Sequence, residues 1–395
     1  MEKTRIWTKN FVILLFANFL GVLVFYLLMT SMAVYAVDRF HTNKSLAGLT
    51  SGIFVIGALI SRVGAGRYMD RFGRKRMILA SGWGSVFAVA AYLLANGIGT
   101  LLAIRFLHGF ICGFLSTTMT AAAIAALPAD RRGEGNAYFS LSLAASMAAG
   151  PFLANFLTGM FSYPGMFVFC AACCAASSAG MLPVRVVEAE HKIVAAEKHR
   201  VGAFRAEDFY EKKALPVSVI LFFGALFYSS VLSFLNVYAQ EGNLGQASSL
   251  FFVVYAALLF VSRPATGRLY DRKGENIVLY PSFVMYAISF ALIAFASKAY
   301  LFVIAAVFMS FGYGTIFAVI QIAAIQISPS ERLGLAISTC SALMDAGIGL
   351  GAYVNGALID LFGYHNMYLI MAAAAIALIP AYSFAHGRKA RKTIP

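Results

Sequence analysis

The sequence predicts an all-α integral membrane protein with twelve transmembrane helices, arranged as two six-helix bundles. Three observations predict this fold. Of the 395 residues, 61% are hydrophobic and only 12% are charged, long apolar runs recur along the chain, and the two halves share short charged phrases. A soluble domain carries about 25% charged residues, so lipid is the expected solvent here. The apolar runs are continuous, which favours helices over the alternating strands of a barrel.

Each predicted helix is an apolar run of about 20 residues, the length that crosses a bilayer. The run after Lys3, Arg5 and Lys9 is longer than a signal-peptide core, so it is expected to remain as the first helix. A short "NGIG" sequence that begins at Asn96 predicts a tight turn between the third and fourth helices. The twelve predicted spans are residues 11–37, 45–66, 77–95, 99–127, 134–160, 163–183, 214–239, 247–267, 276–296, 299–327, 332–360 and 364–386.

The positive charge follows this predicted topology. The formal net charge is +14, and most of the 31 Lys and Arg residues fall in the two termini and in every second loop. The opposite loops hold only Arg39, Lys44 and Lys298. This asymmetry is the positive-inside pattern, so both termini are expected to face the cytoplasm. The expected location is the cell membrane of a bacterium. The basic excess is therefore topological, and no nucleic-acid partner is expected.

All five cysteines lie within predicted helices. Cys170 and Cys173 form a C-x-x-C, but no second pair of ligands accompanies it. We therefore favour small packing residues over a thiol or metal site, which is the alternative. The sequence predicts no metal ion, no cofactor and no catalytic residue.

The two halves of the chain repeat one plan at an offset of 201 residues. "SRVGAGRYMDRFG" at 61–73 aligns with "SRPATGRLYDRKG" at 262–274, and "PADRRG" at 128–133 aligns with "PSERLG" at 329–334. Each matched phrase follows a helix of the same rank in its half. The repeat therefore predicts two bundles of the same topology.

A charged segment separates the two predicted bundles. It predicts an N-terminal bundle at 1–183, a cytoplasmic linker at 184–213 and a C-terminal bundle at 214–395. The linker is too short for a domain, and part of it is expected to form an amphipathic helix on the membrane surface. A linker of this kind allows two rigid halves to rock against each other.

The repeated G-x-x-x-D-R-x-G phrase resembles the signature loop of the major facilitator superfamily. The resemblance covers the whole chain, because the family also has twelve helices, a 6+6 repeat, a central linker and cytoplasmic termini. "LLAIRFLHGF" at 101–110 is similar to the family's fourth-helix pattern, with His108 in place of a glutamine. "SMAAGPFLAN" at 146–155 keeps Gly150 and Pro151 of the fifth-helix motif of proton-driven exporters, for which a helix-packing role is implied.

The same resemblance implies a conformational latch at the cytoplasmic surface. Asp70 is expected to dock near the start of the eleventh helix, around 331–335, and Asp271 near the start of the fifth, around 133–136. Gly66 and Gly267 are expected to let a helix end approach its neighbour closely. The alternative is a role in topology and loop packing alone. The predicted latch residues are Gly66, Asp70, Arg71, Gly73, Arg74, Gly267, Asp271 and Arg272.

Three ionisable residues within the predicted spans are candidates for proton coupling, because a charge at the bilayer centre costs at least about 2.5 kcal/mol. Arg105 in the fourth helix is an electrostatic partner for a proton-carrying acid or an anionic substrate. His108 shares its helix face. Asp345 is the only acid deep in any span, about 13 residues or roughly 20 Å from the start of its helix. Structural pairing inside the bundle is the alternative for each. The glycines of "DAGIGLG", which begins at Asp345, predict a close helix neighbour.

Polar and aromatic residues in the first, fourth, seventh and tenth helices predict a pocket for an amphiphilic or sugar-like molecule. The alternative is that they bond to neighbouring backbone. Arg62 and Arg263 form a repeated pair, which we expect at the cytoplasmic gate or snorkelling to the interface. The predicted substrate-binding residues are Asn18, Tyr26, Thr30, Arg105, Tyr228, Ser229, Ser233, Asn236, Tyr313 and Gln321.

These features predict a secondary active transporter that works as a monomer by alternating access. Proton-driven export of a small organic molecule is the leading hypothesis, and proton-coupled import of a sugar, organic acid or chelate is the second. A membrane-embedded enzyme would need paired carboxylates, a His–Asp grouping or metal ligands, which the sequence does not show. A primary pump would need a G-x-x-x-x-G-K-[ST] nucleotide loop, which is also absent from the sequence.

Overall fold

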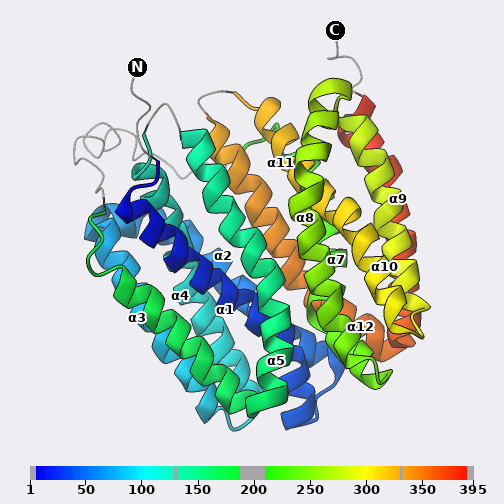
Figure 1. Ribbon diagram of the computed structural model, residues 1–395, viewed down its shortest axis with the longest axis horizontal. Helices are drawn as coiled ribbons and strands as arrows, with labels where there is room; N and C mark the ends of the chain where they lie inside the picture. Colours follow the sequence, from blue (N-terminus) through cyan, green and yellow to red (C-terminus); the bar gives the residue numbers. More distant parts are fainter. Residues whose placement is uncertain (1–5, 129–131, 187–209, 330–331, 389–395) are drawn as a thin grey trace. The chain divides into compact units, whose positions relative to one another are not determined.

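The computed structural model describes residues 6–128, 132–186, 210–329 and 332–388, which fold into helices joined by short turns (Figure 1). Helices suit a lipid solvent because every backbone polar group is paired within the segment. The elements are α1 (Lys9–Phe40), α2 (Lys44–Phe72), α3 (Arg74–Ala91), the 3-10 turn η1 (Tyr92–Leu94), α4 (Ile98–Ala125), α5 (Arg132–Gly180), α7 (Leu215–Glu241), α8 (Gly245–Lys273), α9 (Glu275–Ala294), α10 (Ala299–Met309), the π-helix η5 (Ser310–Gly314), α11 (Thr315–Gln326), α12 (Leu333–Tyr382) and the π-helix η7 (Ser383–Gly387).

The twelve predicted spans are all recovered in these elements. In the described residues, nine helices are long and apolar enough to cross a membrane, and α8 adds a shorter apolar stretch, Ala247–Leu259. Two of the nine contain a break, because α5 leaves the helical conformation at Ser162 and α12 does so at Gly363. The turn predicted at Asn96 is confirmed, since η1 ends just before it and α4 begins just after it.

The internal repeat appears in the backbone as well as in the sequence. Gly73 has a φ of 84° and Gly274 a φ of 79°, and the two residues lie 201 positions apart. Ser162 has a φ of 59° and Gly363 a φ of 77°, again 201 positions apart. Glycine adopts positive φ at little steric cost. The same two connections in each half therefore turn in the same way.

The charged phrases form helix where the sequence predicted a loop. α2 continues through Asp70 to Phe72, and α8 continues to Lys273, so that Gly73 and Gly274 alone interrupt the helices. The helices therefore run beyond Gly66 and Gly267, although the apolar stretches that can cross a membrane end before them, at Arg62 and Leu259. Arg, Tyr, Met and Asp are tolerated in a helix, and the chain leaves the helix only where a positive-φ glycine stops it.

The chain forms two compact units. The first comprises Met1–Ser31 and Ile53–Ala203, and the second comprises Met32–Gly52 and Phe204–Pro395. α1 and α2 are thus divided, and the segment that joins them packs with the second unit. The bundle boundaries predicted from the repeat stay a prediction. The amphipathic stretch predicted for the linker falls in residues 187–209, which lie outside the described residues.

The first unit is held together by close helix approaches at small residues. α3 packs against α4 and α5. α2 and α4 meet at Gly57, Gly109 and Gly113, where an added Cβ would collide with the backbone of the other helix. Without a hydrophobic driving force between helices in lipid, such contacts gain van der Waals energy that larger side chains would prevent.

The second unit uses the same device. α12 packs against α7 and α9, and α10 packs against α8 and α9. The first turns of α2 cross α12 at three glycines: Gly48 faces the carbonyl of Ala352, Gly52 faces that of Gly349, and Gly356 faces that of Lys44. The segment Met32–Gly52 therefore lies directly on the backbone of α12.

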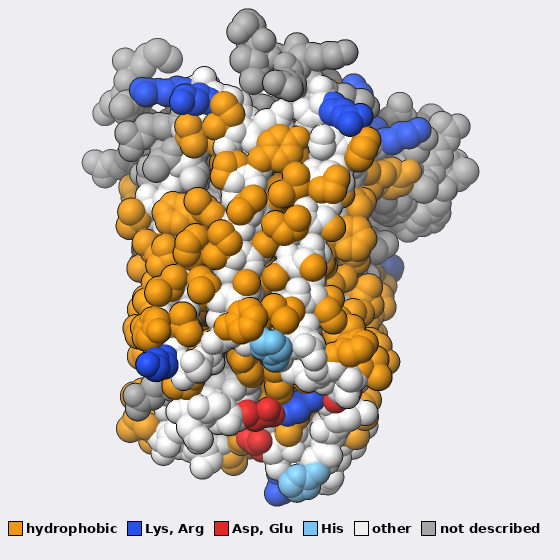
Figure 2. All heavy atoms as spheres, turned by 90° about the vertical axis from the view of Figure 1, so that its right-hand side faces the viewer, with side chains coloured by type: hydrophobic (Ala, Val, Ile, Leu, Met, Phe, Trp, Pro, Cys, Tyr) orange, Lys and Arg blue, Asp and Glu red, His pale blue; other side chains and the backbone are white. Residues whose placement is uncertain are grey.

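Large hydrophobic side chains point outward, as expected for a surface in lipid. Phe87, Leu94, Val261 and Leu361 are each between 72% and 74% exposed. On the face that carries α9 and α10, hydrophobic side chains cover the middle, and Lys and Arg side chains gather at the upper edge (Figure 2). An apolar surface of this extent needs a lipid solvent or a partner to cover it.

Candidate functional site

Arg105 is a fully buried charge in α4, with 1% of its surface exposed. Its Nη1 donates a hydrogen bond to Tyr92 Oη at 3.3 Å, and its Nη2 lies 3.6 Å from Met29 Sδ. The guanidinium carbon lies 4.6 Å from the centroid of the Phe54 ring, a cation–π distance. α1, α2, α4 and η1 together therefore surround this charge inside the first unit.

His108 lies one turn further along α4 and joins the same network. Its Nδ1 lies 2.8 Å from Tyr92 Oη. Because Tyr92 accepts from Arg105, its hydroxyl hydrogen is free to donate to Nδ1, which assigns the imidazole hydrogen of a neutral His108 to Nε2. That Nε2 is buried and has no hydrogen-bond partner among the described residues. A buried donor without a partner costs about 1–3 kcal/mol, so its retention points to a function.

Four tyrosines form a buried aromatic cluster in the second unit. The ring of Tyr228 on α7 stacks on that of Tyr313 in η5, with a centroid separation of 4.3 Å. Tyr255 and Tyr286 extend the cluster at 6.0 Å from Tyr228 and 5.7 Å from Tyr313 respectively. We call these four residues the tyrosine cluster. It lies at the π-helix, and π-helical turns are frequent at functional sites.

The polar face of α7 meets α12 beside this cluster. Asn355 on α12 donates to Ser229 Oγ and to the carbonyl of Leu226, both at 2.9 Å. Ser233 is fully buried, and its hydroxyl has no hydrogen-bond partner in the described structure. Asn236 is also buried. Three of the predicted pocket residues therefore share one buried stretch of α7.

Asp345 lies in α12 and is partly buried. The glycines that follow it lie against α7: Gly347 faces the backbone of Phe222, and Gly351 faces Leu226. The close neighbour expected for this stretch is therefore α7. Asp345 thus belongs to the same pair of packed helices as the polar face of α7.

The candidates on α1 bond locally within the first unit. Asn18 Nδ2 donates to Ser142 Oγ of α5 at 2.8 Å, and Thr30 Oγ1 donates to the carbonyl of Tyr26, one turn earlier, at 2.9 Å. Gly150 of α5 lies against Tyr26, where an added Cβ would come within 2.6 Å of the Tyr26 Cβ. α5 thus crosses α1 next to the helix-interior Pro151. The remaining predicted substrate-binding residue, Gln321 on α11, is partly buried.

A carboxylate caps the first turn of α2 in the second unit. Asp360 of α12 accepts hydrogen bonds from the backbone N–H groups of Lys44, at 2.9 Å, and Ser45, at 2.8 Å. The Lys44 ammonium forms an ion pair with Glu241 at 2.8 Å. We call Lys44, Ser45, Glu241 and Asp360 the α2 cap cluster. It lies at the opposite end of α2 from the repeated charged phrase.

The predicted latch residues are described only in part. The surroundings of Gly66 and the side chains of Asp70 and Asp271 lie outside what the structure describes, as do parts of the segments to which they were expected to dock. Among the described residues, no atom lies within 4 Å of an added Cβ at Gly267, so the close helix approach expected there stays a prediction. α8 is still a regular helix at this point, and the residue that needs glycine is the positive-φ Gly274.

The arginines of the latch set lie at the ends of the same helices. Arg71 is exposed and its guanidinium lies 5.4 Å from the ring centroid of Phe72. Arg74 begins α3 directly after Gly73, and Arg272 is exposed at the end of α8. These positions leave the cations at a membrane surface.

Comparison with known families decides the fold. The model of the Major Facilitator Superfamily matches residues 14–299 and 249–394. The chain belongs to the Major Facilitator Superfamily. It is therefore a multi-pass membrane transporter of small molecules with the 6+6 helical fold, and it is not an enzyme.

Relatives of this facilitator include a protein named as a drug efflux pump, one named for multidrug resistance, and an uncharacterized transporter. An uncharacterized MFS-type transporter of Methanocaldococcus jannaschii is 23% identical over 381 residues, covering 94% of this chain and 95% of the relative. The multi-drug resistance efflux pump PmrA of Streptococcus pneumoniae is 22% identical over 382 residues, covering 92% of both chains. The multidrug resistance protein MdtG of Escherichia fergusonii is 24% identical over 402 residues, covering 98% and 96%.

Solved structures of other facilitators share the fold. The nucleoside transporter NupG superposes with a TM-score of 0.75 at 13% identity, over 96% of this chain and 99% of NupG. A POT family transporter in complex with a thioalcohol-conjugated peptide gives a TM-score of 0.76 at 14% identity, over 95% and 96%. These likenesses establish the architecture of this facilitator and leave its substrate open.

Several residues of the site were missed by sequence reasoning. Tyr92 joins Arg105 to His108, yet it stands at the end of an apolar run where tyrosine is ordinary. Tyr255 and Tyr286 give no periodic signal for the same reason. Asn355 and Asp360 had a detectable signal, because polar residues in or near a membrane span are costly and are retained for a purpose.

Proposed function

We propose that this facilitator exports a small organic molecule in exchange for protons. The observation that carries the proposal is the buried network of Arg105, Tyr92 and His108, a charge and a titratable group that share one hydroxyl inside the first unit. A membrane helix retains such groups mainly at proton and substrate pathways. The relative PmrA is named as a drug efflux pump and MdtG as a multidrug resistance protein, and the name of PmrA supports the outward direction.

His108 and Asp345 are the proposed proton carriers. The Nε2–H of His108 is a buried donor without a partner in the described residues, so a substrate acceptor there would gain a hydrogen bond that the protein itself does not supply. Asp345 lies deep in α12 beside glycines that admit α7.

The substrate is proposed to be amphiphilic and to carry an aromatic or similarly flat apolar part. The tyrosine cluster offers stacked rings with hydroxyl groups at their edges, and α7 adds the hydroxyls of Ser229 and Ser233 and the amide of Asn236. Rings of this kind bind flat apolar surfaces by offset stacking. Separation of α7 from η5 would be needed to expose the stacked rings, as expected for a site that forms during the transport cycle.

Alternating access is proposed to use contacts at both ends of α2. At the basic end, Asp70 and Asp271 with their arginines form the proposed latch. At the other end, the α2 cap cluster holds Met32–Gly52 on α12. Opening at either end must break the contacts there, so the two sets of contacts favour different states of the cycle. The protein is proposed to work as a monomer with both termini in the cytoplasm.

Import of an anionic molecule is the second candidate, because Arg105 offers a buried guanidinium to a carboxylate or a chelate.

Transport into proteoliposomes distinguishes a loss of proton coupling from a loss of substrate binding. A compound is first found by a thermal-shift screen of dyes, antibiotics, sugars and metal chelates at two pH values. We expect Asp345→Asn to abolish its proton-driven accumulation while leaving exchange of labelled for unlabelled compound. Proton-driven accumulation at the wild-type rate by Asp345→Asn would remove Asp345 from the coupling role.

A further inference from the structure

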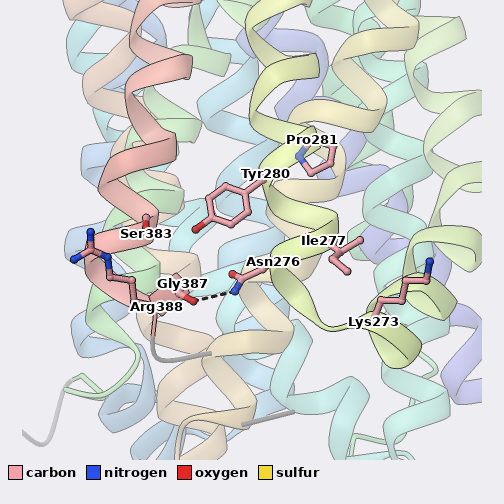
Figure 3. A pocket seen from close by; sticks show the side chains of 8 residues that line it. All are labelled: Lys273, Asn276, Ile277, Tyr280, Pro281, Ser383, Gly387 and Arg388. Atoms are coloured by element: carbon pink, nitrogen blue, oxygen red, sulfur yellow. Dashed lines mark hydrogen bonds between the residues drawn. The ribbon is translucent and has the colours of Figure 1, made fainter. Parts of the chain in front are cut away.

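A pocket opens on the second unit where the end of α8, the start of α9 and η7 meet. Its volume is about 760 Å³. Figure 3 shows Lys273 and Arg388 at opposite ends of the row of lining side chains, with Asn276 and Tyr280 between them. The remaining lining residues are Ile277, Pro281, Ser383 and Gly387. Two cations therefore flank a wall that is polar at one side and apolar at the other.

The polar wall of the pocket is fixed by hydrogen bonds. Asn276 Nδ2 donates to the carbonyl of Gly387 at 2.9 Å, and Asn276 Oδ1 accepts from Tyr382 Oη at 2.9 Å. An added Cβ at Gly387 would lie 2.9 Å from both Tyr280 Oη and the Tyr382 ring. The contact between α9 and η7 is thus tight, and the pocket is a built feature of the fold.

The positive charge of the pocket is not cancelled by its buried acidic neighbour. Glu275 precedes Asn276 but is buried behind the wall, where His386 Nε2 lies 2.6 Å from its Oε1. Tyr382 Oη also lies 3.1 Å from the same oxygen, and its single hydrogen is shared between Glu275 and Asn276. Lys273 is exposed, and the Arg388 guanidinium stacks on the ring of Phe384, at 4.4 Å from its centroid. Both cations are therefore presented at the surface of the pocket.

The apolar side of the pocket continues along α9. Ile277, Val284 and Ile288 are 50%, 40% and 37% exposed, and their spacing puts them on one face of the helix. From Ile277 to Ile288 this stripe runs for roughly 16 Å at 1.5 Å per residue. A bilayer leaflet has a hydrocarbon depth of about 15 Å, half of the whole core. The stripe therefore has the length of a lipid acyl chain.

We propose that this pocket binds the headgroup of an anionic phospholipid of the surrounding bilayer. Its anionic headgroup occupies the pocket between Lys273 at one end and Arg388 at the other, its hydroxyls meet Asn276, Tyr280 and Ser383, and one acyl chain follows the stripe on α9. The distribution of basic residues predicts that this end of the unit faces the cytoplasm, where anionic lipids attract clustered cations. Basic pockets between helices on that side are the expected place for such headgroups.

Native mass spectrometry of the full-length protein tests the proposal with two lipids of identical acyl chains, phosphatidylglycerol and phosphatidylcholine. The wild type should retain phosphatidylglycerol in preference. Lys273→Gln with Arg388→Gln should weaken that binding by about 25-fold, at about fivefold per cation, the factor for about 1 kcal/mol. The matched control is Lys212→Gln with Lys213→Gln, two exposed cations of the same unit that do not line the pocket. It should bind as the wild type does.

Two further measurements distinguish loss of lipid binding from loss of fold and from binding of free phosphate. Lys273→Arg with Arg388→Lys keeps both charges and should keep the preference, which separates loss of charge from loss of fold. Inorganic phosphate at millimolar concentration should leave the bound lipid in place. Equal retention of the two lipids by the wild type, an unchanged preference in the Gln double variant, or complete displacement by phosphate would each overturn the proposal.

Discussion

The α2 cap cluster gives the sharpest prediction about conformational change. Asp360→Ala removes the two hydrogen bonds that its carboxylate accepts from the backbone of Lys44 and Ser45. Loss of such a cap costs about 1 kcal/mol, and loss of a negative charge at a helix N-terminus costs about 0.3–1 kcal/mol more. The segment Met32–Gly52 is in equilibrium between a form packed on α12 and a form released from it. The total loss of about 1.5 kcal/mol shifts this equilibrium roughly tenfold toward the released form.

The assay uses a cysteine at Ser51, which is fully buried and lies in the same segment, Met32–Gly52. In the Ser51→Cys background, the rate of alkylation by a membrane-impermeant maleimide measures how often the segment is released. The five native cysteines set the background, measured in protein without the Ser51 change. Asp360→Ala should raise the rate about tenfold, in proportion to the population of the released form.

Two companion variants test whether the Asp360 cap contributes more to holding the segment than the neighbouring contacts do. Glu241→Gln removes the charge that pairs with Lys44 and leaves both Asp360 hydrogen bonds in place. Because Glu241 is 52% exposed, a rise of at most about fivefold is expected. Asn366→Ala removes a side chain that bonds only within its own helix, to Phe362, and should change nothing. An unchanged rate in Asp360→Ala, or a larger rise in Glu241→Gln, would refute the capping argument.

Three other expectations follow from single residues. Ser162 has φ 59° and ψ −178°, a region that glycine almost alone occupies, so Ser162→Gly should raise the thermal unfolding midpoint by an amount worth about 1 kcal/mol; a lower midpoint would contradict this. Tyr92→Phe removes the hydroxyl between Arg105 and His108 and should lower proton-driven flux about tenfold, at about 1–3 kcal/mol, with little change in binding of the compound; wild-type flux would dismiss the network. Asp70→Asn should slow turnover with little change in substrate affinity, as read from KM and kcat in proteoliposomes, whereas a large affinity loss at normal turnover would count against a latch.

The sequence was sufficient for the helices and the repeat because both leave a linear signal. Apolar runs located the spans, and the matched phrases led to the 201-residue offset that Gly73 and Gly274 also show in the backbone. The apolar runs did not show that the helices continue past Gly66 and Gly267, because charged residues beyond the hydrocarbon can still extend a helix.

The direction in which each side chain points could not be predicted from the sequence, for a physical reason. In lipid, the buried face and the lipid-facing face of a helix are both apolar, so hydrophobicity does not show which way a residue points. Tyr228 and Tyr313 were predicted for one pocket and do stack, but the same argument also named Thr30, whose hydroxyl bonds to its own helix. The partners Tyr92 and Asn355 emerge only when distant parts of the chain are brought together.

The direction of proton-driven transport in inverted membrane vesicles tests the central claim most directly. The vesicle interior then corresponds to the outside of the cell. The account predicts that an interior more acidic than the bath drives accumulation of the compound identified by thermal shift, and that collapse of the gradient stops it. Accumulation driven only by an interior more alkaline than the bath would show import with protons and would contradict export.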